Sequence, residues 1–322
     1  MKKIAFVIPY FGKFPNYFEL WVKSVESNPT IDFILYTDNN IDFCKPTNLK
    51  IIKTNFIEFK NKIQKVIEFP ISLKTPYKLC DYKPVYGKAL ESDLKGYDFW
   101  GYCDMDLIFG NIRKFVTEEI LNGYDKIFTH GHMTIFRNND KCKELFRCKH
   151  NFMAYRYDEA YKTEYCCHFD EWGGISTYLD ELNFLQYDAN VYADVDCKKY
   201  AFKMFGRNDI SYPMIFEWNE GKAFCHTNLF GQVELLYIHL QKRKMSVNID
   251  ISKSLRYLII PNKFVEYTNV TEEYIVNNAK NSIYFEYWII RLKELWVKFK
   301  TGAIKQIFLR RYKKWRIKHE NK

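Results

Sequence analysis

The sequence predicts an α/β fold in which a mixed, mainly parallel sheet is flanked by helices. Short apolar runs rich in β-branched and aromatic residues alternate with segments of helical spacing. Polar turns follow several of these runs, as expected at the carboxyl ends of buried parallel strands. The chain has 322 residues, of which 47% are hydrophobic and 18% aromatic, so it can bury a sizeable core.

The amino-terminal part supplies strand, helix and strand in turn. Residues 4–8 form a β-branched run that ends at Pro9, which predicts a first buried strand. Apolar residues three and four apart predict a helix over 17–27, and Asn28-Pro29 ends it. Further strands are predicted over 32–36 and 49–53. A nucleotide-binding crevice would lie across the exits of such strands.

The middle of the chain continues this alternation. Its elements are predicted as a helical segment over 56–68, a helix over 85–94 with Pro84 in its first turn, a strand over 99–103, paired strands over 126–129 and 133–137, a loop and helix over 169–182, and a strand-rich stretch to about residue 226. No repeat or Gly/Ser linker interrupts it. We therefore predict one domain over 1–250, a connecting segment over 251–283 and a basic amphipathic helical tail over 284–322.

The cysteines and the absence of long apolar stretches narrow the class of protein. The nine cysteines are odd in number and none form a CxxC pair, which argues against a disulfide framework or a zinc ribbon. Cys166, Cys167 and His168 are adjacent, and strand neighbours point to opposite faces, so we do not expect a zinc site there. No apolar stretch reaches the roughly 18 residues of a spanning helix, and Pro9 interrupts any signal-peptide core. We expect a cytoplasmic protein.

The positive charge is concentrated at the end of the chain. Residues 291–322 contain twelve Lys and Arg against Glu294 and Glu320, an excess of ten that equals the formal net charge of +10. Aromatic and aliphatic residues are interleaved with these cations, a pattern typical of an interfacial helix. The tail is therefore expected to bind the anionic inner face of the cell membrane, with no nucleic-acid partner expected. The alternative is packing of the apolar stripe against the domain or against a second subunit in a homo-oligomer.

Two carboxylates follow the strand predicted over 99–103. Asp104 and Asp106 stand at i and i+2, at the edge where α/β sheets bind ligands. Two such carboxylates repel each other unless a cation holds them, and Mn²⁺ or Mg²⁺ there could also clamp a pyrophosphate. The alternative is a solvated turn or a helix-capping pair.

The order of three motifs resembles that of GT-A glycosyltransferases, which have a Rossmann-like fold: a first strand ending in Pro9-Tyr10-Phe11, a Thr37-Asp38-Asn39 exit, and Tyr102-Cys103-Asp104-Met105-Asp106. More narrowly, residues 80–87 and 96–111 resemble an uncharacterised glycosyltransferase-like family of bacterial capsule and lipopolysaccharide loci. This resemblance extends from residue 1 to about 245.

The resemblance implies roles for several residues. It implies that Asp104 and Asp106 hold the metal and the donor diphosphate, and that Pro9, Tyr10, Phe11 and Asp38 lie close to the base and ribose. Lys83 is implied as a phosphate contact, where a cation would form charge-assisted hydrogen bonds; the alternative is a surface lysine.

A late histidine completes the metal shell in several GT-A enzymes, and His239, in an apolar strand before a cationic turn, is the candidate here. Lys242 and Lys244 in that turn favour an edge that faces phosphate. A core histidine is the alternative reading.

Two further segments contain candidate residues. Asp170 and Glu171 lie beside an aromatic residue and two glycines, and one of them would be the base that deprotonates the acceptor if the reaction inverts. They could instead cap a helix that begins near Gly174. His130 and His132 are expected to be surface residues of a turn.

Together these features predict a metal-dependent hexosyltransferase. It would transfer a sugar from a nucleotide-sugar donor, in our prediction UDP-linked, to a hydroxyl of a bacterial surface glycan or a lipid-linked glycan. A nucleotidyltransferase would also need paired carboxylates, but residues 9–12 are not a Gly-rich phosphate loop. A non-enzymatic membrane-surface module is the other alternative, and it predicts that Asp104 and Asp106 are dispensable.

Overall fold

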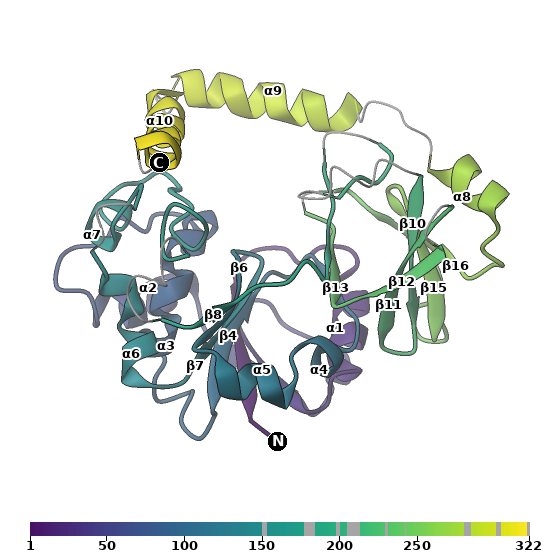
Figure 1. Cartoon of the computed structure of the whole chain (residues 1–322), viewed down its shortest axis with the longest axis horizontal. Helices are drawn as coiled ribbons and strands as arrows, with labels where there is room; N and C mark the ends of the chain where they lie inside the picture. Colours follow the sequence, from purple (N-terminus) through teal and green to yellow (C-terminus); the bar gives the residue numbers. More distant parts are fainter. Residues whose placement is uncertain are drawn as a thin grey trace.

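A computed structural model describes residues 1–149, 153–176, 184–197, 200–204, 213–228, 231–241, 243–279, 285–300 and 304–320. The predicted α/β architecture is confirmed (Figure 1). A seven-stranded central sheet has the order β3-β2-β1-β4-β7-β6-β8. Its strands are β1 Ile4–Tyr10, β2 Ile31–Thr37, β3 Leu49–Lys53, β4 Phe99–Cys103, β6 Lys126–His130, β7 Met133–Arg137 and β8 Gln186–Tyr187.

The central sheet is mixed but mainly parallel, as predicted. Strands β3, β2, β1 and β4 pair in parallel, and β6 pairs in parallel with β8. Only β7 runs against its neighbours β4 and β6. The carboxyl ends of β1 and β4 therefore lie side by side, which brings the segments after Tyr10 and after Cys103 to the same edge of the sheet.

Both faces of the central sheet are buried, because alternate residues of each strand enter different cores. Along β1, Ile4, Phe6 and Ile8 pack in one cluster and Ala5 and Val7 in another. The first cluster includes residues of α1 (Phe18–Glu26), α4 (Ile112–Phe115) and α5 (Glu118–Gly123). The second includes residues of α2 (Phe56–Gln64), the 3-10 helix η1 (Pro76–Val85), α3 (Tyr86–Ala89), α6 (Asp140–Lys143), η2 (Leu145–Arg147) and α7 (Tyr157–Ala160).

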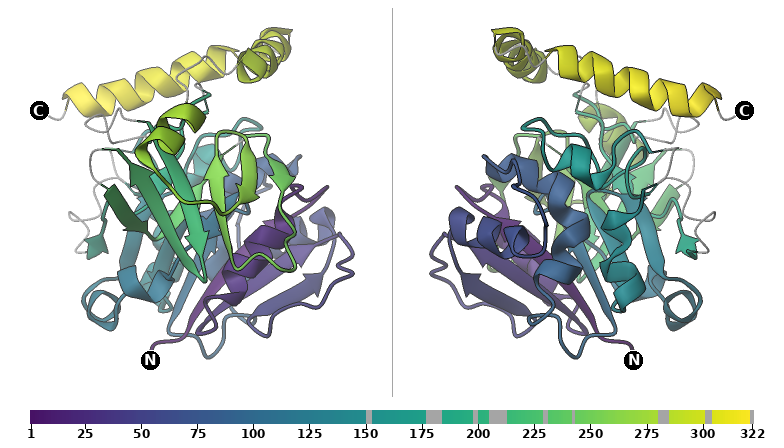
Figure 2. Two further views of the ribbon diagram at one scale, coloured as in Figure 1. Left: turned by 90° about the vertical axis from the view of Figure 1, so that its right-hand side faces the viewer. Right: turned by 90° about the vertical axis from the view of Figure 1, so that its left-hand side faces the viewer.

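Two smaller sheets lie beside the central sheet (Figures 1 and 2). A six-stranded sheet has the order β12-β11-β10-β15-β16-β14, and a three-stranded sheet has the order β5-β13-β9. Their bounds are β5 Leu107–Phe109, β9 Ala193–Asp194, β10 Met214–Asn219, β11 Lys222–Thr227, β12 Gly231–Leu235, β13 Tyr237–His239, β14 Ser246–Asn248, β15 Arg256–Ile260 and β16 Lys263–Glu266. Helix α1 packs between the central and six-stranded sheets, because Trp21 contacts the core of the first and Leu20 that of the second.

The helix predicted over 85–94 is wrong in extent. The structure has the 3-10 helix η1 up to Val85 and then a single α-helical turn, α3. Pro84 lies inside η1, where it has no N–H to donate and disfavours α conformation at the preceding residue. Asp81 of η1 accepts a hydrogen bond from Lys78 within the same helix and tertiary hydrogen bonds from the amides of Cys167 and Phe169, which hold η1 in place.

The predicted boundary at residue 250 cuts through the six-stranded sheet. The connecting segment expected over 251–283 contains β15 and β16, and β15 pairs with β10. Helix α8 (Glu272–Asn278) then packs on the same sheet through Ile275. The strands were missed because they are short and their partner lies about 40 residues earlier in the chain, so only the folded chain shows the pairing.

Two helices follow, α9 (Phe285–Lys300) and α10 (Ile304–Glu320), where the sequence predicted a basic helical tail. They lie along one side of the molecule, above the carboxyl ends of the central strands (Figure 1). Within the described residues, no helix is long and apolar enough to cross a membrane.

Strand β4 tolerates no side chain at Gly101. A Cβ atom there would lie 2.5 Å from the backbone oxygen of Thr134 in β7. We expect Gly101→Ala to lower the free energy of unfolding by about 2 kcal/mol, because the strand pair must move apart to admit the methyl group. Denaturant titration measures this loss. Gly123→Ala is the control, since nothing lies within 4 Å of that Cβ position; an equal loss in both variants would contradict the argument.

Candidate active site

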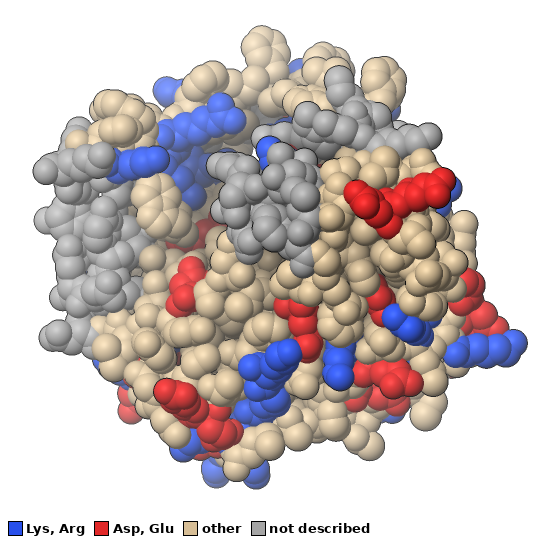
Figure 3. All heavy atoms as spheres, turned by 45° about the vertical axis from the view of Figure 1, so that its right-hand side comes forward, with Lys and Arg blue, Asp and Glu red and all other residues tan. Residues whose placement is uncertain are grey.

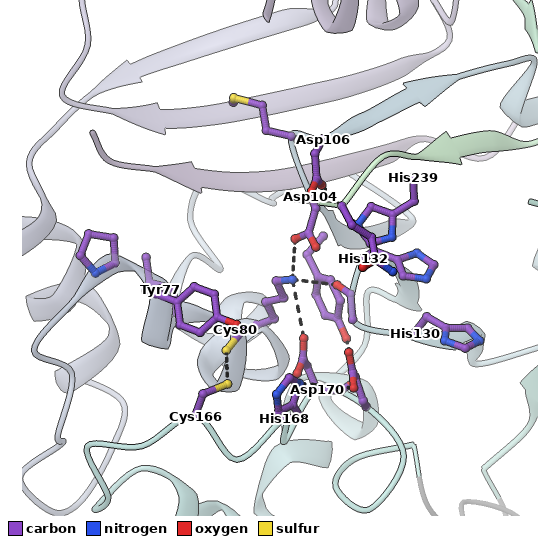
Figure 4. A pocket seen from close by; sticks show the side chains of 18 of the residues that line it. Tyr77, Cys80, Asp104, Asp106, His130, His132, Cys166, His168, Asp170 and His239 are labelled. Atoms are coloured by element: carbon purple, nitrogen blue, oxygen red, sulfur yellow. Dashed lines mark hydrogen bonds and ion pairs between the residues drawn. The ribbon is translucent and has the colours of Figure 1, made fainter. Parts of the chain in front are cut away.

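A cavity of about 1330 Å³ opens at the carboxyl ends of β1 and β4. Its lining includes Asp104, Asp106 and His239 together with Lys83 and Asp170. In Figure 4 these acidic and imidazole groups face one another across the cavity. Five candidates from four separate parts of the sequence therefore share one site.

The backbone groups of Asp104 and Asp106 form hydrogen bonds with two different segments of the chain. The amide of Asp104 donates to the carbonyl of His132, at 2.9 Å, which ties it to the turn before β7. The carbonyl of Asp106 accepts from the amide of Leu240, at 3.0 Å. Strand β5 follows at once and pairs with β13, with Leu107 opposite His239. This pairing is what brings His239 to the two carboxylates.

His239 is held between two carboxylates. Its Nδ1 lies 2.7 Å from Asp194 Oδ1, and its Nε2 lies 3.4 Å from Asp106 Oδ1. Burial alone would lower the pKa of His239, but Asp106 and Asp194 raise it to about 10. The surrounding carboxylates thus favour positive charge at this position. An aspartate on the far nitrogen of an imidazole is also the arrangement that orients histidine ligands in metal sites.

The residues present fit a divalent ion. One ligand atom each from Asp104, Asp106 and His239 lies within 4.8 Å of the others. Asp106 Oδ1 is buried and accepts no hydrogen bond from the described residues. Two carboxylates and one imidazole suit Mn²⁺ or Mg²⁺, and three protein ligands would leave positions for oxygens of a substrate.

Lys83, near the end of η1, is a cation that lies against the carboxylates of the site. Its Nζ lies 2.6 Å from Asp104 Oδ1, 2.8 Å from the carbonyl oxygen of Gly131 and 3.6 Å from Asp170 Oδ2. Its side chain is only 12% exposed. It is therefore not a solvated surface lysine, and it stands between the two acidic parts of the cavity.

Asp170 and Glu171 differ in environment although they are neighbours. Asp170 is 2% exposed, and its Oδ1 is buried without a hydrogen-bond partner among the described residues. Burial raises the pKa of Asp170 well above its ordinary value, against the opposing effect of Lys83. Burial also acts to raise the pKa of Glu171, but a hydrogen bond and charge pairing with His168 lower it to about 2. Asp170 is thus the stronger base of the pair.

The other predicted residues are placed as follows. Pro9 and Tyr10 line the cavity. Phe11 packs against Phe56 and Phe59, with ring centroids 5.7 Å apart in both pairs, and is not a lining residue. Asp38 is exposed and accepts from the amide of Gly12 at 3.2 Å, so it shapes the loop after β1.

Three other predictions concern the edges of the cavity. Lys242 lies outside the described residues, while the neighbouring Lys244 lines the cavity. The helix expected to begin near Gly174 would also fall largely outside them, and residues 171–176 form turns. The capping alternative for Asp170 is therefore not tested by the described part of the chain.

The expectation of surface histidines is wrong for His132. It is 6% exposed, its Nδ1 lies 2.8 Å from the hydroxyl of Tyr237, and its ring packs against Tyr192 and His239. The aromatic residues that cover it come from β13 and from the segment before β9. Asp194 was missed altogether, because β9 has only two residues and no periodicity marks it.

Comparison with models of protein families shows to which family the chain belongs. A family model described as "Family of unknown function (DUF6625)" matches residues 6–268. The chain belongs to this family. The match runs through β15 and β16, so it includes the whole six-stranded sheet and ends before the tail helices. No curated protein matches the sequence.

Solved glycosyltransferase structures are similar to part of the DUF6625 chain. The galactosyltransferase LgtC in complex with donor and acceptor sugar analogs has 14% identity and a TM-score of 0.32 over 59% of this chain and 75% of its own. An active-site mutant of LgtC has 13% identity and a TM-score of 0.32 over 59% of this chain and 74% of its own. The glycosyltransferase GlyE of Streptococcus pneumoniae TIGR4 has 10% identity and a TM-score of 0.29 over 59% of this chain and 45% of its own.

Proposed function

We propose that this DUF6625 protein is a metal-dependent glycosyltransferase of the GT-A type that uses a nucleotide-sugar donor. The observation that supports it is the convergence of Asp104, Asp106 and His239, with Asp194 behind the imidazole, in a cavity that also holds Lys83 and Asp170. We further propose that the donor is a UDP-hexose, and that the acceptor is a hydroxyl of a bacterial surface glycan, including a lipid-linked glycan.

The side chains have separate roles in this proposal. Asp104, Asp106 and His239 would hold Mn²⁺ or Mg²⁺, which when bound offsets the charge that develops on the departing diphosphate. Lys83 lies next to Asp104 and donates charge-assisted hydrogen bonds to the same phosphates. Pro9 and Tyr10 form the wall at the nucleotide end. Asp170, across Lys83 from Asp104, accepts the proton of the acceptor hydroxyl in an inverting reaction.

Isothermal titration of UDP and of GDP, each with and without Mn²⁺, tests the proposal on the full-length protein. We expect one nucleotide to bind in a manganese-dependent way, which also identifies the base of the donor. Hydrolysis of the matching nucleotide-sugar should then depend on the metal. If the folded protein binds neither nucleotide, the transferase proposal is wrong and a non-enzymatic membrane-surface module becomes the better explanation.

Asp194 is a positioning residue for His239 in this proposal. We expect Asp194→Asn to weaken Mn²⁺ binding by about 10-fold to 100-fold, because the imidazole loses the carboxylate that orients it. Titration followed by the paramagnetic resonance of free Mn²⁺ measures the affinity. Asp188→Asn is the control, since Asp188 is exposed and is not a lining residue. Unchanged Mn²⁺ affinity in Asp194→Asn would remove Asp194 from the site.

Both tail helices direct charged side chains towards the cavity. The lining residues are Arg291 and Glu294 of α9 and Ile307, Arg310 and Arg311 of α10. Several large apolar side chains of these helices are exposed, among them Phe285 at 72%, Leu292 at 64%, Trp296 at 60%, Phe299 at 73% and Phe308 at 65%. Within the described residues, these exposed apolar faces belong to none of the core clusters of the domain.

We propose that these faces bind an anionic lipid surface. Lys and Arg side chains appear at the upper left of Figure 3, on the side of the molecule where the tail helices lie, whereas charges of both signs mix in its lower half. Each cation near an anionic leaflet contributes about 1 kcal/mol, and the exposed aromatic residues suit the headgroup region. Docked in this way, the cavity would open beside the membrane, within reach of a lipid-linked acceptor.

Vesicle sedimentation tests the tail. We expect binding to vesicles that contain phosphatidylglycerol, and a loss of at least about tenfold in the variant Trp296→Glu/Phe299→Glu. Leu255→Glu is the matched control, because Leu255 is 59% exposed and far along the chain from the tail. Equal loss of vesicle binding in both variants would contradict the role of the tail. No vesicle binding together with a concentration-dependent dimer would favour the homo-oligomer instead.

A further inference from the structure

Cys80 and Cys166 meet at the wall of the cavity, although 86 residues separate them. Cys80 belongs to η1, and Cys166 belongs to the loop that leads to Asp170. Their sulfur atoms lie 2.8 Å apart, both side chains are half-buried, and both line the cavity (Figure 4). A small reagent in the cavity can therefore reach the pair.

The surroundings of this pair favour disulfide chemistry over metal binding. Two sulfurs bound to one zinc ion lie about 3.8 Å apart, given Zn–S bonds of about 2.3 Å in a tetrahedron. A zinc ion would need a further ligand, and the nearby carboxylate is that of Asp81. It already accepts hydrogen bonds from Lys78 Nζ at 2.5 Å and from the amides of Cys167 and Phe169 at 2.7 and 2.8 Å. Its oxygens are thus occupied. A disulfide, in contrast, needs the sulfurs to approach by less than about 1 Å.

We propose that Cys80 and Cys166 form a reversible disulfide by exchange with a low-molecular-weight disulfide. The site is a modification site, and it is independent of the glycosyl transfer proposed above. The Cys166 thiolate attacks one sulfur of the small disulfide and expels the other half as a thiol. Cys80 then attacks the Cys166 sulfur and expels the second half. Two protein thiols are oxidised, one small disulfide is reduced to two thiols, and the two protons leave with those thiols.

The charges around Cys166 assign it the attacking role. Its hydrogen bond with Cys80 and its pairing with His168 lower the pKa of the Cys166 thiol to about 4, against the opposing effect of burial. Asp81 of η1 also faces it, and Arg310 of α10 donates to its carbonyl oxygen at 3.2 Å. The hydrogen bond to Cys166 raises the pKa of Cys80, as does burial, so Cys80 is the resolving thiol.

The neighbouring Cys167 provides an internal contrast. It is 4% exposed, and burial raises the pKa of its thiol to about 12. Its amide donates to Asp81 and its thiol lies 3.5 Å from the carbonyl oxygen of Tyr165, whereas the thiol of Cys166 contacts Cys80. Of these two neighbouring cysteines, Cys166 is the half-buried one that contacts a second thiol, Cys80.

The link would tie two parts of the active-site wall together. Cys80 lies three residues before Lys83, and Cys166 lies four residues before Asp170. In the reduced protein, hydrogen bonds from the loop to Asp81 join these segments. A covalent cross-link over 86 residues restricts the unfolded chain, so the oxidised protein should melt at a temperature about 5 °C higher.

Peptide mass spectrometry of the full-length protein, after incubation with glutathione disulfide, tests the proposal. We expect the Cys80–Cys166 peptide as the main cross-link, and we expect dithiothreitol to remove it. Cys80→Ser should stop at a mixed disulfide on Cys166, Cys166→Ser should give no cross-link, and Cys167→Ser should behave as wild type. The melting temperature should rise on oxidation in wild type and Cys167→Ser only.

Two results would overturn the proposal. One is a cross-link through Cys167 or a product confined to the exposed Cys44. The other is alkylation by iodoacetamide at pH 6 that is no faster at Cys166 than at Cys44, where we expect a difference of at least about tenfold. Neither measurement uses a sugar donor, so failure here leaves the proposed transferase activity untouched.

Discussion

Replacing both Asp104 and Asp106 by alanine is expected to abolish manganese-dependent nucleotide binding and to lower the rate of sugar transfer by at least about a thousandfold. The two carboxylates are the oxygen ligands that converge with His239, and Asp106 Oδ1 has no other partner in the described part of the chain. Without them only the imidazole of His239 remains to bind a divalent ion. The transition state then loses the several kcal/mol by which the metal stabilises the charge on the departing diphosphate.

The measurement is titration of the nucleotide that wild type binds, with Mn²⁺ present, followed by the rate of donor hydrolysis. Asp42→Asn serves as the control, because Asp42 is exposed and does not line the cavity. The melting temperature of each variant checks that the fold survives, since Lys83 loses its partner at 2.6 Å when Asp104 is removed. A folded double variant that still binds nucleotide with manganese would refute the assigned metal centre.

Much of the central sheet could be predicted from the sequence because its strands are signalled locally. Residues 4–8 and 99–103 are continuous apolar runs, and the structure buries them on both faces of the sheet. Since such strands end at a common edge, Asp104 and Asp106 could be assigned without coordinates to the edge where β1 and β4 end. Local pattern and tertiary structure agree in these segments.

The rest of the site depends on pairings that no local pattern encodes. His239 reaches Asp106 through β5 and β13, which have three residues each and lie about 130 residues apart. Asp194 lies in a strand of two residues. His132 follows a glycine in a turn, which normally places a histidine in solvent, but Tyr192 and Tyr237 cover it here. Short strands derive their positions from tertiary contacts, so their residues can be recognised only in the folded chain.

The contact between Cys80 and Cys166 also could not be predicted, because no local sequence pattern encodes it. The sequence argument placed Cys166 and Cys167 on opposite faces of a strand, but the structure has no strand over residues 166–168. That argument considers only the local segment, and the partner of Cys166 comes from η1 instead. Asp81 is what connects η1 to this loop, through amides of Cys167 and Phe169. A buried carboxylate that accepts backbone amides leaves no signature in sequence spacing.

Asp170→Asn is expected to lower kcat by about 100-fold to 10,000-fold while nucleotide and manganese binding stay unchanged. The amide has nearly the shape of the carboxylate but cannot accept a proton. Asp170 is suited to this role because burial raises its pKa, whereas pairing with His168 lowers the pKa of Glu171 to about 2. Glu171→Gln should therefore reduce kcat much less than Asp170→Asn, although both carboxylates line the cavity.

The pH dependence of kcat separates a base from a residue that only shapes the cavity. A raised pKa means that Asp170 is protonated at low pH and becomes a base as pH rises, so kcat of wild type should increase with pH through that pKa. In Asp170→Asn this rise should disappear, because no proton is gained or lost at the amide. Steady-state rates from pH 5 to 9, with saturating donor, measure the profile. A variant that keeps the wild-type pH profile at a lower rate would show that Asp170 acts by packing against Gly131 and Lys83, and not as the base.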